Sequence, residues 1–387
     1  MSQGVVILGS TGSVGETALR VLRELRESFH VVGLAAGRRA DRLMEQIQEF
    51  SPSVVSVASG EDARRIRARF PRLEVAYGPH GNTVVADAPD ARTVIAAIVG
   101  AEGLAPTFKA VQKGKRVALA NKEALVMAGR LVMDGARRSG AEILPVDSEH
   151  CAVYQCSRGE SAKHILRVLL TASGGALRDC PLEDLEGASP EQVLRHPTWQ
   201  MGPKITVDSA TMMNKGLEVI EAHHLFSLPV DRISVLMHRE SIVHSLVEFV
   251  DGSVLAQLAE ADMALPVQYA LTYPVRKPCP MPRLDLAHIA GLTFSAPDEK
   301  RFPCLSLARQ AAQTSEAHKV ALNAANEVAV GAFLEKRLSF GGIPRLIRRV
   351  LDATVPTTLA SLEHILALDK ASRAAALAFL EHPERLT

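Results

Sequence analysis

Short apolar runs alternate with helix-like stretches over roughly the first 150 residues, and this alternation limits the possible folds more than any other feature. The runs that we expect to be buried strands are 5–8, 31–35, 54–58, 93–98, 117–120 and 143–146. Intervening stretches such as 16–28 and 41–50 show helical spacing of apolar residues. Such alternation predicts an α/β fold in which helices cover a parallel, doubly wound, Rossmann-like sheet.

The rest of the chain has a different pattern of apolar and polar residues. Two strand-like stretches, 233–250 and 253–259, flank Asp251-Gly252, a strong hairpin signal, and indicate a central α+β domain. A proline-rich stretch follows and reads as a linker, and the alanine-rich remainder predicts a helical bundle. We therefore expect a nucleotide-binding domain (1–150), a central catalytic domain (151–272), a linker (273–303) and a C-terminal helical domain (304–387).

Composition indicates a protein without a nucleic-acid or membrane partner. The 387 residues carry a net charge of +1, so no global field favours polyanions. No apolar run approaches the roughly 20 residues that cross a bilayer, and the first strand-like run does not resemble a signal peptide. Five cysteines without a Cys-x-x-Cys pair fit reduced thiols. We expect a cytoplasmic protein.

A glycine-rich turn follows the first predicted strand. Gly9, Gly12 and Gly15 would let the backbone approach a pyrophosphate at the start of a helix. Two arginines, Arg38 and Arg39, follow the second strand where an acidic residue usually selects NAD, and they favour the 2′-phosphate of NADP. The plainer alternatives are a glycine turn without a ligand and an exposed basic loop.

Three polar residues, Asn121-Lys122-Glu123, follow the predicted strand 117–120. Ligands of open parallel sheets bind beyond the carboxyl ends of the strands, so this triplet would face the cofactor crevice. Taken alone, it could also be an ordinary helix start.

The carboxylates of Asp147 and Glu149 follow another apolar run. In an extended segment both would point to one side, with no compensating cation nearby in the sequence. Oxygen ligands alone favour Mg²⁺ or Mn²⁺ over zinc, and Glu218 is the natural third ligand. We expect His150 to be a structural histidine rather than a ligand.

The segment 207–218 combines a hydroxyl, an amide, an ammonium and a carboxylate. Ser209 is a candidate N-cap, and Asn214 and Glu218 lie one helical turn apart. Such a helix start suits a phosphate, and Glu218 suits a hard cation. The alternative is a solvated amphipathic helix start.

Two further segments offer substrate contacts. Ser173 and two glycines follow a strand-like run, and together they supply a hydroxyl on a flexible backbone. The loop from His196 to Gly202 contains Trp199, the single tryptophan, between proline and glycine. Trp199 could close over a substrate as a lid, although a lone tryptophan is more often a packing residue. His196 could bind phosphate or cap a helix.

Together these segments closely resemble the 1-deoxy-D-xylulose 5-phosphate reductoisomerase family. The matching motifs run in the family's order over nearly the whole chain and are Leu8-Gly9-Ser10-Thr11-Gly12-Ser13-Val14-Gly15, Ala120-Asn121-Lys122-Glu123, Val146-Asp147-Ser148-Glu149-His150, Ser173-Gly174-Gly175, His196-Pro197-x-Trp199-x-Met201-Gly202, 209–218 and Asn323-Ala324-Ala325-Asn326-Glu327.

The resemblance implies an NADP-dependent oxidoreductase of the non-mevalonate isoprenoid pathway. It would be a homodimer of three-part chains and would convert 1-deoxy-D-xylulose 5-phosphate, a phosphosugar, into 2-C-methyl-D-erythritol 4-phosphate. NADPH and Mg²⁺ or Mn²⁺ would be its cofactors, and the phosphonate fosmidomycin would inhibit it.

Roles carry over residue by residue. The implied metal ligands are Asp147, Glu149 and Glu218, and the implied catalytic residues are these three with Lys122. The implied substrate-binding residues are Lys122, Ser148, Glu149, Ser173, His196, Trp199, Ser209, Asn214, Lys215 and Glu218, with the phosphate on Ser173, Ser209, Asn214 and Lys215. Trp199 and Met201 match a mobile flap. The implied NADPH positions are Thr11, Gly12, Ser13, Val14, Gly37, Arg38, Arg39, Asn121, Glu123 and Gly202.

The chain departs from the family pattern at a few positions. Ala176-Leu177 replaces a usual Pro-Phe, Arg239-Glu240 a usual Pro-Gln, and Arg39 a usual asparagine. None is an implied metal ligand, so the departures bear on affinity and local stability.

Two rival interpretations remain open. A semialdehyde dehydrogenase would need a nucleophilic cysteine, and Cys151 and Cys156 lack its context. A nucleotide-sensing regulatory protein would not need the carboxylates and lysines.

Overall fold

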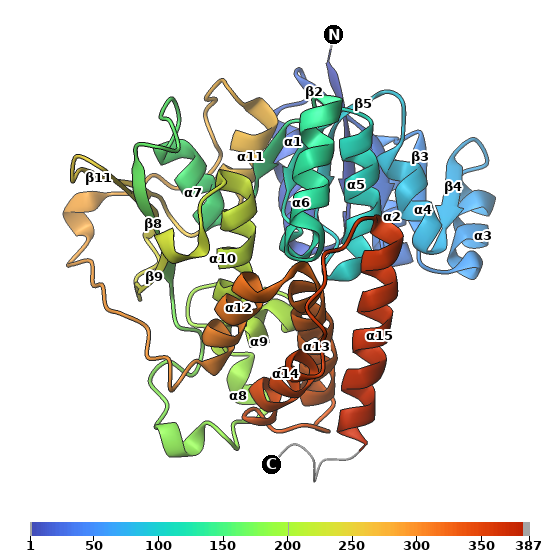
Figure 1. The fold of residues 1–387 in the computed structure, drawn as a ribbon. Helices are drawn as coiled ribbons and strands as arrows, with labels where there is room; N and C mark the ends of the chain where they lie inside the picture. The colour runs from blue at the N-terminus through green and yellow to red at the C-terminus, as the bar shows by residue number, and fades with distance from the viewer. Residues whose placement is uncertain (1, 200, 382–387) are drawn as a thin grey trace. The chain divides into compact units, whose positions relative to one another are not determined.

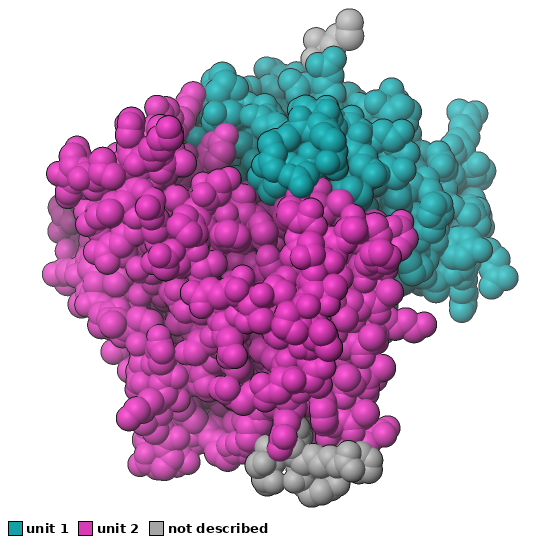
Figure 2. Space-filling view, viewed as in Figure 1, with its two compact units in different colours: residues 1–124, 132–151, 262–282 teal, residues 125–131, 152–261, 283–387 magenta. Residues whose placement is uncertain are grey.

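The computed structural model describes residues 2–199 and 201–381 (Figure 1). Residue 1, residue 200 and residues 382–387, which include the outer ends of the first and last predicted domains, lie outside the described residues. The chain forms two compact units, coloured separately in Figure 2. The first unit comprises 1–124, 132–151 and 262–282, and the second comprises 125–131, 152–261 and 283–387.

The first unit is built on a seven-stranded parallel sheet. Its strands are β1 (Gln3–Leu8), β2 (Phe29–Ala35), β3 (Val54–Val57), β4 (Glu74–Tyr77), β5 (Ala91–Ala96), β6 (Arg116–Leu119) and β7 (Ile143–Pro145). Their order, β4-β3-β2-β1-β5-β6-β7, confirms the predicted α/β fold with a Rossmann-like sheet. The order reverses between β1 and β5, the position at which such sheets bind ligands.

Helices of the first unit follow each strand in turn. They are α1 (Ser13–Glu24), α2 (Ala40–Phe50), α3 (Gly60–Arg69), α4 (Gly78–Ala86), α5 (Leu104–Gln112), the two ends of α6 (Lys122–Ser139), the start of α7 (Ser148–Cys156) and, much later in the chain, α11 (Ala264–Thr272). The middle of α6, 125–131, belongs to the second unit. Helices on a parallel sheet bury its strands, and in β1 every residue except Gln3 is buried. The late helix α11 packs on α1, β6 and β7.

The second unit contains a four-stranded mixed sheet. Its strands β8 (Ile165–Ala172), β9 (Ile233–Met237), β10 (Val243–Phe249) and β11 (Val254–Leu258) lie in the order β11-β10-β8-β9. The predicted hairpin at Asp251-Gly252 is confirmed, since β10 and β11 pair antiparallel around it. The prediction of a single strand over 233–250 was wrong. The chain turns after β9, with Ser241 at a φ of 56°, and β9 pairs parallel with β8 instead.

The second unit also contains helices. They are α8 (Pro190–Val193), α9 (Pro203–Ala210), α10 (Met213–Phe226), α12 (Pro303–Thr314), α13 (Glu316–Leu334), α14 (Gly342–Asp352) and α15 (Leu362–Leu380). The described residues after 303 contain no strand, which confirms the helical character predicted for this region. One apolar core joins α9, α10, α12, α13 and α14, so the C-terminal helices support the segment 203–226 directly.

The proline-rich stretch contains little regular structure. Among its described residues are one short 3-10 helix, Leu286–His288, and an isolated bridge between Met237 and Ser295. Residues up to Pro282 belong to the first unit and those from Arg283 to the second. Within the described part of the chain, no helix is both long and apolar enough to cross a membrane.

Candidate active site

The predicted glycine turn lies between β1 and α1. Gly9 has a φ of +83°, and the amide of Gly12 donates to the Gly9 carbonyl at 2.9 Å. A Cβ on Gly15 would lie 2.3 Å from that same carbonyl oxygen, so a side chain there would break the turn. Among the described side chains none caps α1, whose N-cap is Gly12. The first-turn amides and the helix dipole therefore suit an anionic ligand.

The two arginines predicted to select NADP follow β2. Gly37, Arg38 and Arg39 are exposed, and Arg39 is the N-cap residue of α2. Because β1 and β2 are parallel neighbours, their carboxyl ends lie at one edge of the sheet. The glycine turn, with Thr11 buried and Ser13 exposed, is thus placed at the same edge as both guanidinium groups.

Asn121 has a structural role at this edge. Its Nδ2 donates to the carbonyls of Ile98 and Gly100 at 2.7 and 3.0 Å, and its Oδ1 accepts from the Ala124 amide at 3.1 Å. The side chain thereby caps α6 and holds the loop after β5. It also donates to Glu123, so the triplet is part of the protein's own hydrogen bonding.

Lys122 and Asp147 form a largely buried ion pair. They follow β6 and β7, which are parallel neighbours, and Lys122 Nζ lies 2.6 Å from Asp147 Oδ2. No compensating cation lies near the carboxylates in the sequence, but strand order brings Lys122 to Asp147. Glu149 is not in an extended segment but in the first turn of α7, where Ser148 Oγ donates to it.

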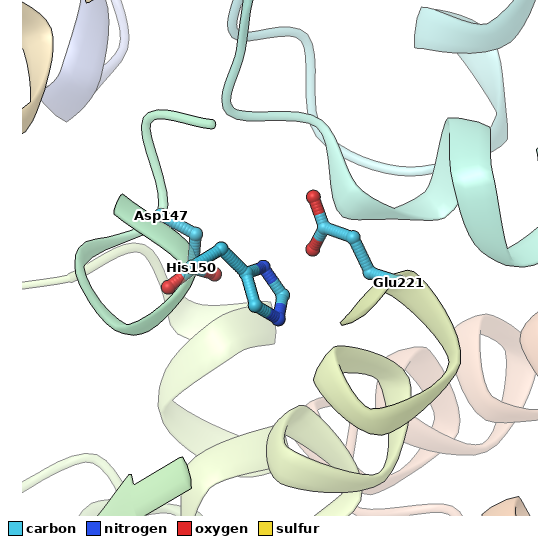
Figure 3. Close-up of side chains that lie close together, drawn as sticks. All are labelled: Asp147, His150 and Glu221. Carbon is cyan, nitrogen blue, oxygen red and sulfur yellow. The ribbon is translucent and has the colours of Figure 1, made fainter. Parts of the chain in front are cut away.

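The two carboxylates of the first unit nevertheless lie together. Asp147 and Glu149 have ligand oxygens within 4.8 Å of each other, and His150, fully buried, offers a ring nitrogen within the same distance of Asp147. Figure 3 shows Asp147 and His150 on this short segment, and Glu221 on α10. Two hard oxygen donors at this spacing fit a magnesium-type ion.

In the second unit, the segment 203–218 forms two helices. Ser209 is not an N-cap but lies in the last turn of α9, whose N-cap is Gly202 and whose N1 residue is Pro203. Met212, at a φ of 60°, separates α9 from α10. Ser209 is half-buried, and a Cβ on Gly175 would lie 2.8 Å from its carbonyl carbon, so the turn after β8 packs directly on Ser209.

Glu218 is a buried carboxylate with two donors one turn earlier in α10. Asn214 Nδ2 donates to its Oε1 at 2.6 Å, and Lys215 Nζ forms an ion pair with its Oε2. The predicted spacing of one helical turn between Asn214 and Glu218 is confirmed. Lys215 and Glu218 are 3% and 1% exposed, so the ammonium and the carboxylate are desolvated, and the half-buried Asn214 amide adds a donor to them.

Ser173 and His196 contact each other in the same unit. Ser173 follows β8, and its Oγ lies 3.0 Å from His196 Nε2. The other ring nitrogen of His196 accepts the amides of Thr198 and Trp199 at 3.2 and 2.9 Å. Trp199 and Met201 are half-buried, and the Trp199 ring lies 6.4 Å from that of His244.

One buried contact of this region was absent from the sequence interpretation. Asp208, 1% exposed, accepts from Asn326 Nδ2 at 2.8 Å and pairs with Lys204 at 2.9 Å. The i,i+4 spacing of Lys204 and Asp208 was a usable signal. The contact with Asn326 on α13 joins residues far apart in the chain, so local spacing could not indicate it.

A Rossmann-like sheet with a glycine turn, together with buried lysine–carboxylate pairs, defines the class of α/β nucleotide-dependent enzymes. Family models sharpen this class. That of 1-deoxy-D-xylulose 5-phosphate reductoisomerase matches residues 5–129, and two for C-terminal domains of the same enzyme match 143–226 and 258–375. The chain belongs to the 1-deoxy-D-xylulose 5-phosphate reductoisomerase family.

Individual relatives agree over nearly full length. The enzymes of that name from Chlorobium phaeovibrioides and Geobacter metallireducens are each 49% identical, over 97% and 94% of this chain and 98% and 96% of theirs. A crystal structure of DOX-P reductoisomerase with NADPH, fosmidomycin and magnesium superposes with a TM-score of 0.93 at 39% identity, covering 99% of both chains. The Zymomonas mobilis enzyme with NADPH gives 0.92 at 38% identity, covering 98% of this chain and 100% of that one.

Proposed function

We propose that the chain catalyses the NADPH- and divalent-metal-dependent conversion of 1-deoxy-D-xylulose 5-phosphate into 2-C-methyl-D-erythritol 4-phosphate. The observation that carries this proposal is family membership over nearly the whole chain, joined to intact lysine–carboxylate groups in both units. Similar chains hold NADPH, magnesium and fosmidomycin in their crystal structures.

The chain has a suitable place for NADPH. The close backbone packing of the glycine turn leaves no room for a Cβ on Gly15, and the turn opens a helix whose first amides can receive a pyrophosphate. We assign Thr11, Gly12, Ser13 and Val14 to this contact, and Arg38 and Arg39 to the 2′-phosphate. Gly37, Asn121, Glu123 and Gly202 complete the assignment, with Asn121 acting through its cap on α6.

The metal would be held by Asp147 and Glu149 of the first unit and Glu218 of the second. The oxygen-only donor set fits Mg²⁺ or Mn²⁺. Two of these charges have lysine partners in the protein alone, since Lys122 pairs with Asp147 and Lys215 pairs with Glu218, to which the neutral amide of Asn214 also donates. A dication would add positive charge to a group that already contains excess carboxylate.

The substrate phosphate would lie on Ser173, Ser209, Asn214 and Lys215. The support is that the Ser173 turn packs on Ser209, and that α10 begins shortly afterwards with an amide and an ammonium. His196, hydrogen-bonded to Ser173 and to the backbone of Trp199, would hold the flap that covers the substrate. Binding a phosphate remote from the reacting carbons supplies energy for positioning them.

The chain's own residues would then orient and polarise the sugar. When bound, the metal acts as a Lewis acid on the substrate oxygens, and NADPH supplies the two electrons that reduce the rearranged aldehyde. Lys122, an ammonium donor held against Asp147, would stabilise negative charge as it develops on an oxygen. Ser148 and Glu149 would fix the sugar backbone, and Trp199 with Met201 would exclude water.

We further propose a cytoplasmic homodimer. The second sheet ends in β11, an edge strand whose Val254 and Leu255 are exposed, and Leu166 on β8 and Val250 in the turn after β10 are exposed as well. An apolar sheet edge in water favours pairing with another copy. The five cysteines are free thiols, which fits a reducing compartment.

The decisive experiment follows NADPH absorbance with purified protein, 1-deoxy-D-xylulose 5-phosphate and Mg²⁺ or Mn²⁺, with NADH as the comparison. Metal-dependent oxidation that prefers NADPH is expected. The variant Glu149→Gln should lower turnover about 1,000-fold, since it removes a ligand charge, while leaving NADPH binding intact. Glu160→Gln, at an exposed carboxylate, is the matched control.

Two results would overturn parts of this proposal. Full turnover by Glu149→Gln would remove the metal assignment. Absence of oxidation in protein shown to bind NADPH would favour a different substrate or a regulatory role, which is the alternative left open by the sequence.

A further inference from the structure

The turn that carries Ser173 is closed by an arginine outside the assigned site. Arg178 Nη1 donates to the Ser173 carbonyl at 3.1 Å and, at the longer distance of 3.4 Å, to the Arg239 carbonyl. Gly174 has a φ of +84°, and a Cβ there would lie 2.9 Å from the Cβ of Arg178. The side chain of Arg178 therefore packs directly over the turn, and its hydrogen bond to the Ser173 carbonyl closes the turn.

The same turn is connected to the flap through one imidazole. His196 Nδ1 accepts two backbone amides, those of Thr198 and Trp199, so this nitrogen carries no proton. The proton is then on Nε2, which faces Ser173 Oγ at 3.0 Å. A doubly protonated ring could not accept those amides. The connection from Ser173 through His196 to Trp199 therefore requires a neutral ring.

The charges around this imidazole favour its neutral form. Burial first, and then the positive charge of Arg178, lower the pKa of His196 to about 4. Beyond Arg178, Asp179 forms an ion pair with Arg239 and lies 3.6 Å from Arg178 Nε. Arg195, next to His196 in the chain, is exposed and is screened by water.

We propose that Arg178 is a positioning residue for substrate binding, which holds the Ser173 turn and, through its charge, lowers the pH at which the His196 connection to the flap opens. The phosphate as the ligand of this turn rests on the proposed function. The hydrogen bonds of Arg178 and His196 are independent of the proposed function.

The first test uses the free protein and its single tryptophan. Trp199 fluorescence, titrated with acid, should change as His196 gains a proton and releases the flap amides. In Arg178→Met, which keeps length but removes charge, the midpoint should rise by about one pH unit. Arg239→Met, which removes the neighbouring guanidinium without touching the Ser173 carbonyl, should keep the wild-type midpoint. Circular dichroism at each pH separates this change from acid unfolding.

The second test measures kinetics at neutral pH. Arg178→Met should raise the KM for 1-deoxy-D-xylulose 5-phosphate about 10-fold, with kcat and the KM for NADPH within about threefold of wild type. Arg178→Lys keeps the charge but not the planar donor. It should therefore keep the wild-type fluorescence midpoint, and its KM should lie between those of wild type and Arg178→Met.

Either test can overturn the proposal. A midpoint and a KM in Arg178→Met equal to those of Arg239→Met would assign Arg178 no positioning role. If wild-type protein fails to turn over the substrate, the proposed function is lost, yet the fluorescence midpoint still decides whether Arg178 controls His196.

Discussion

Asp208 is a carboxylate enclosed in the apolar core that joins α9, α10 and α12. Its two oxygens are separately satisfied, one by Asn326 on α13 and one by Lys204 on its own helix. Both Asp208 and Asn326 are almost fully buried. This pair therefore connects the helix that carries Ser209 to the C-terminal helices. We expect its loss to lower the free energy of unfolding more than it lowers catalytic activity.

Replacing Asn326 tests this contact. Asn326→Ala should lower the free energy of unfolding by about 2 kcal/mol, because a buried carboxylate loses a donor. Asn326→Asp should cost more at pH 7, since two carboxylates would then face each other, and the difference between the variants should shrink as the pH falls and one of them is protonated. Urea denaturation at pH 7 and pH 5 measures both. Values within 0.5 kcal/mol of wild type for Asn326→Ala would contradict the assignment.

The residues of the candidate site were easier to find than their contacts. Asp147, Glu149 and Glu218 could be named from residue type and motif, but the Lys122 partner could not, since its proximity depends on β6 and β7 being neighbours. The turn at Met212 escaped prediction as well, because a methionine at positive φ gives no signal of the kind that glycine gives. Ser209 was therefore placed at the wrong end of a helix.

Among elements, α10 and α12 cross at a glycine. A Cβ on Gly216 would lie 2.4 Å from the Cβ of Ala308, so the two helices approach more closely than any side chain allows. Gly331, on α13, has nothing within 4 Å of the same added atom. Comparing alanine substitutions at these two glycines separates the contribution of helix propensity to stability from that of packing.

The substitutions Gly216→Ala and Gly331→Ala should change stability in opposite directions. Gly216→Ala should destabilise by about 2 kcal/mol, because the helices must separate, and it should weaken activity through Glu218, two residues further along the same helix. Gly331→Ala should stabilise by about 0.5 to 1 kcal/mol through helix propensity. Thermal unfolding of both variants is the measurement, and destabilisation by both would show that the crossing is not the cause.

Element prediction failed where local signals were weak. β4 was missed because Val75 is the one buried residue among its four, so the strand gives no continuous apolar run. The strands β9 and β10 were merged because the turn between them uses Ser241 at positive φ rather than glycine. The remaining strands of the parallel sheet were predicted to within a few residues, since strands buried on both faces give continuous apolar runs.

At the scale of the whole molecule, the proposed homodimer depends on the edge of the second sheet. Leu255→Asp, at a half-exposed position on β11, should shift the protein towards monomers by placing a charge in the pairing surface. Leu377→Asp, at a similarly exposed leucine on α15, is the control and should leave the assembly unchanged. Sedimentation velocity distinguishes them. Wild-type protein that sediments as a monomer would end the proposal.

The first unit is not a continuous stretch of chain. Its sheet is complete at β7, but α11, which packs on α1, β6 and β7, is encoded only after the whole second sheet. On a ribosome, the sheet must therefore wait for residues 264–272 before the face beneath that helix is covered. A released chain that ends before residue 264 should expose apolar surface there and should be a better chaperone substrate than one that ends after residue 282.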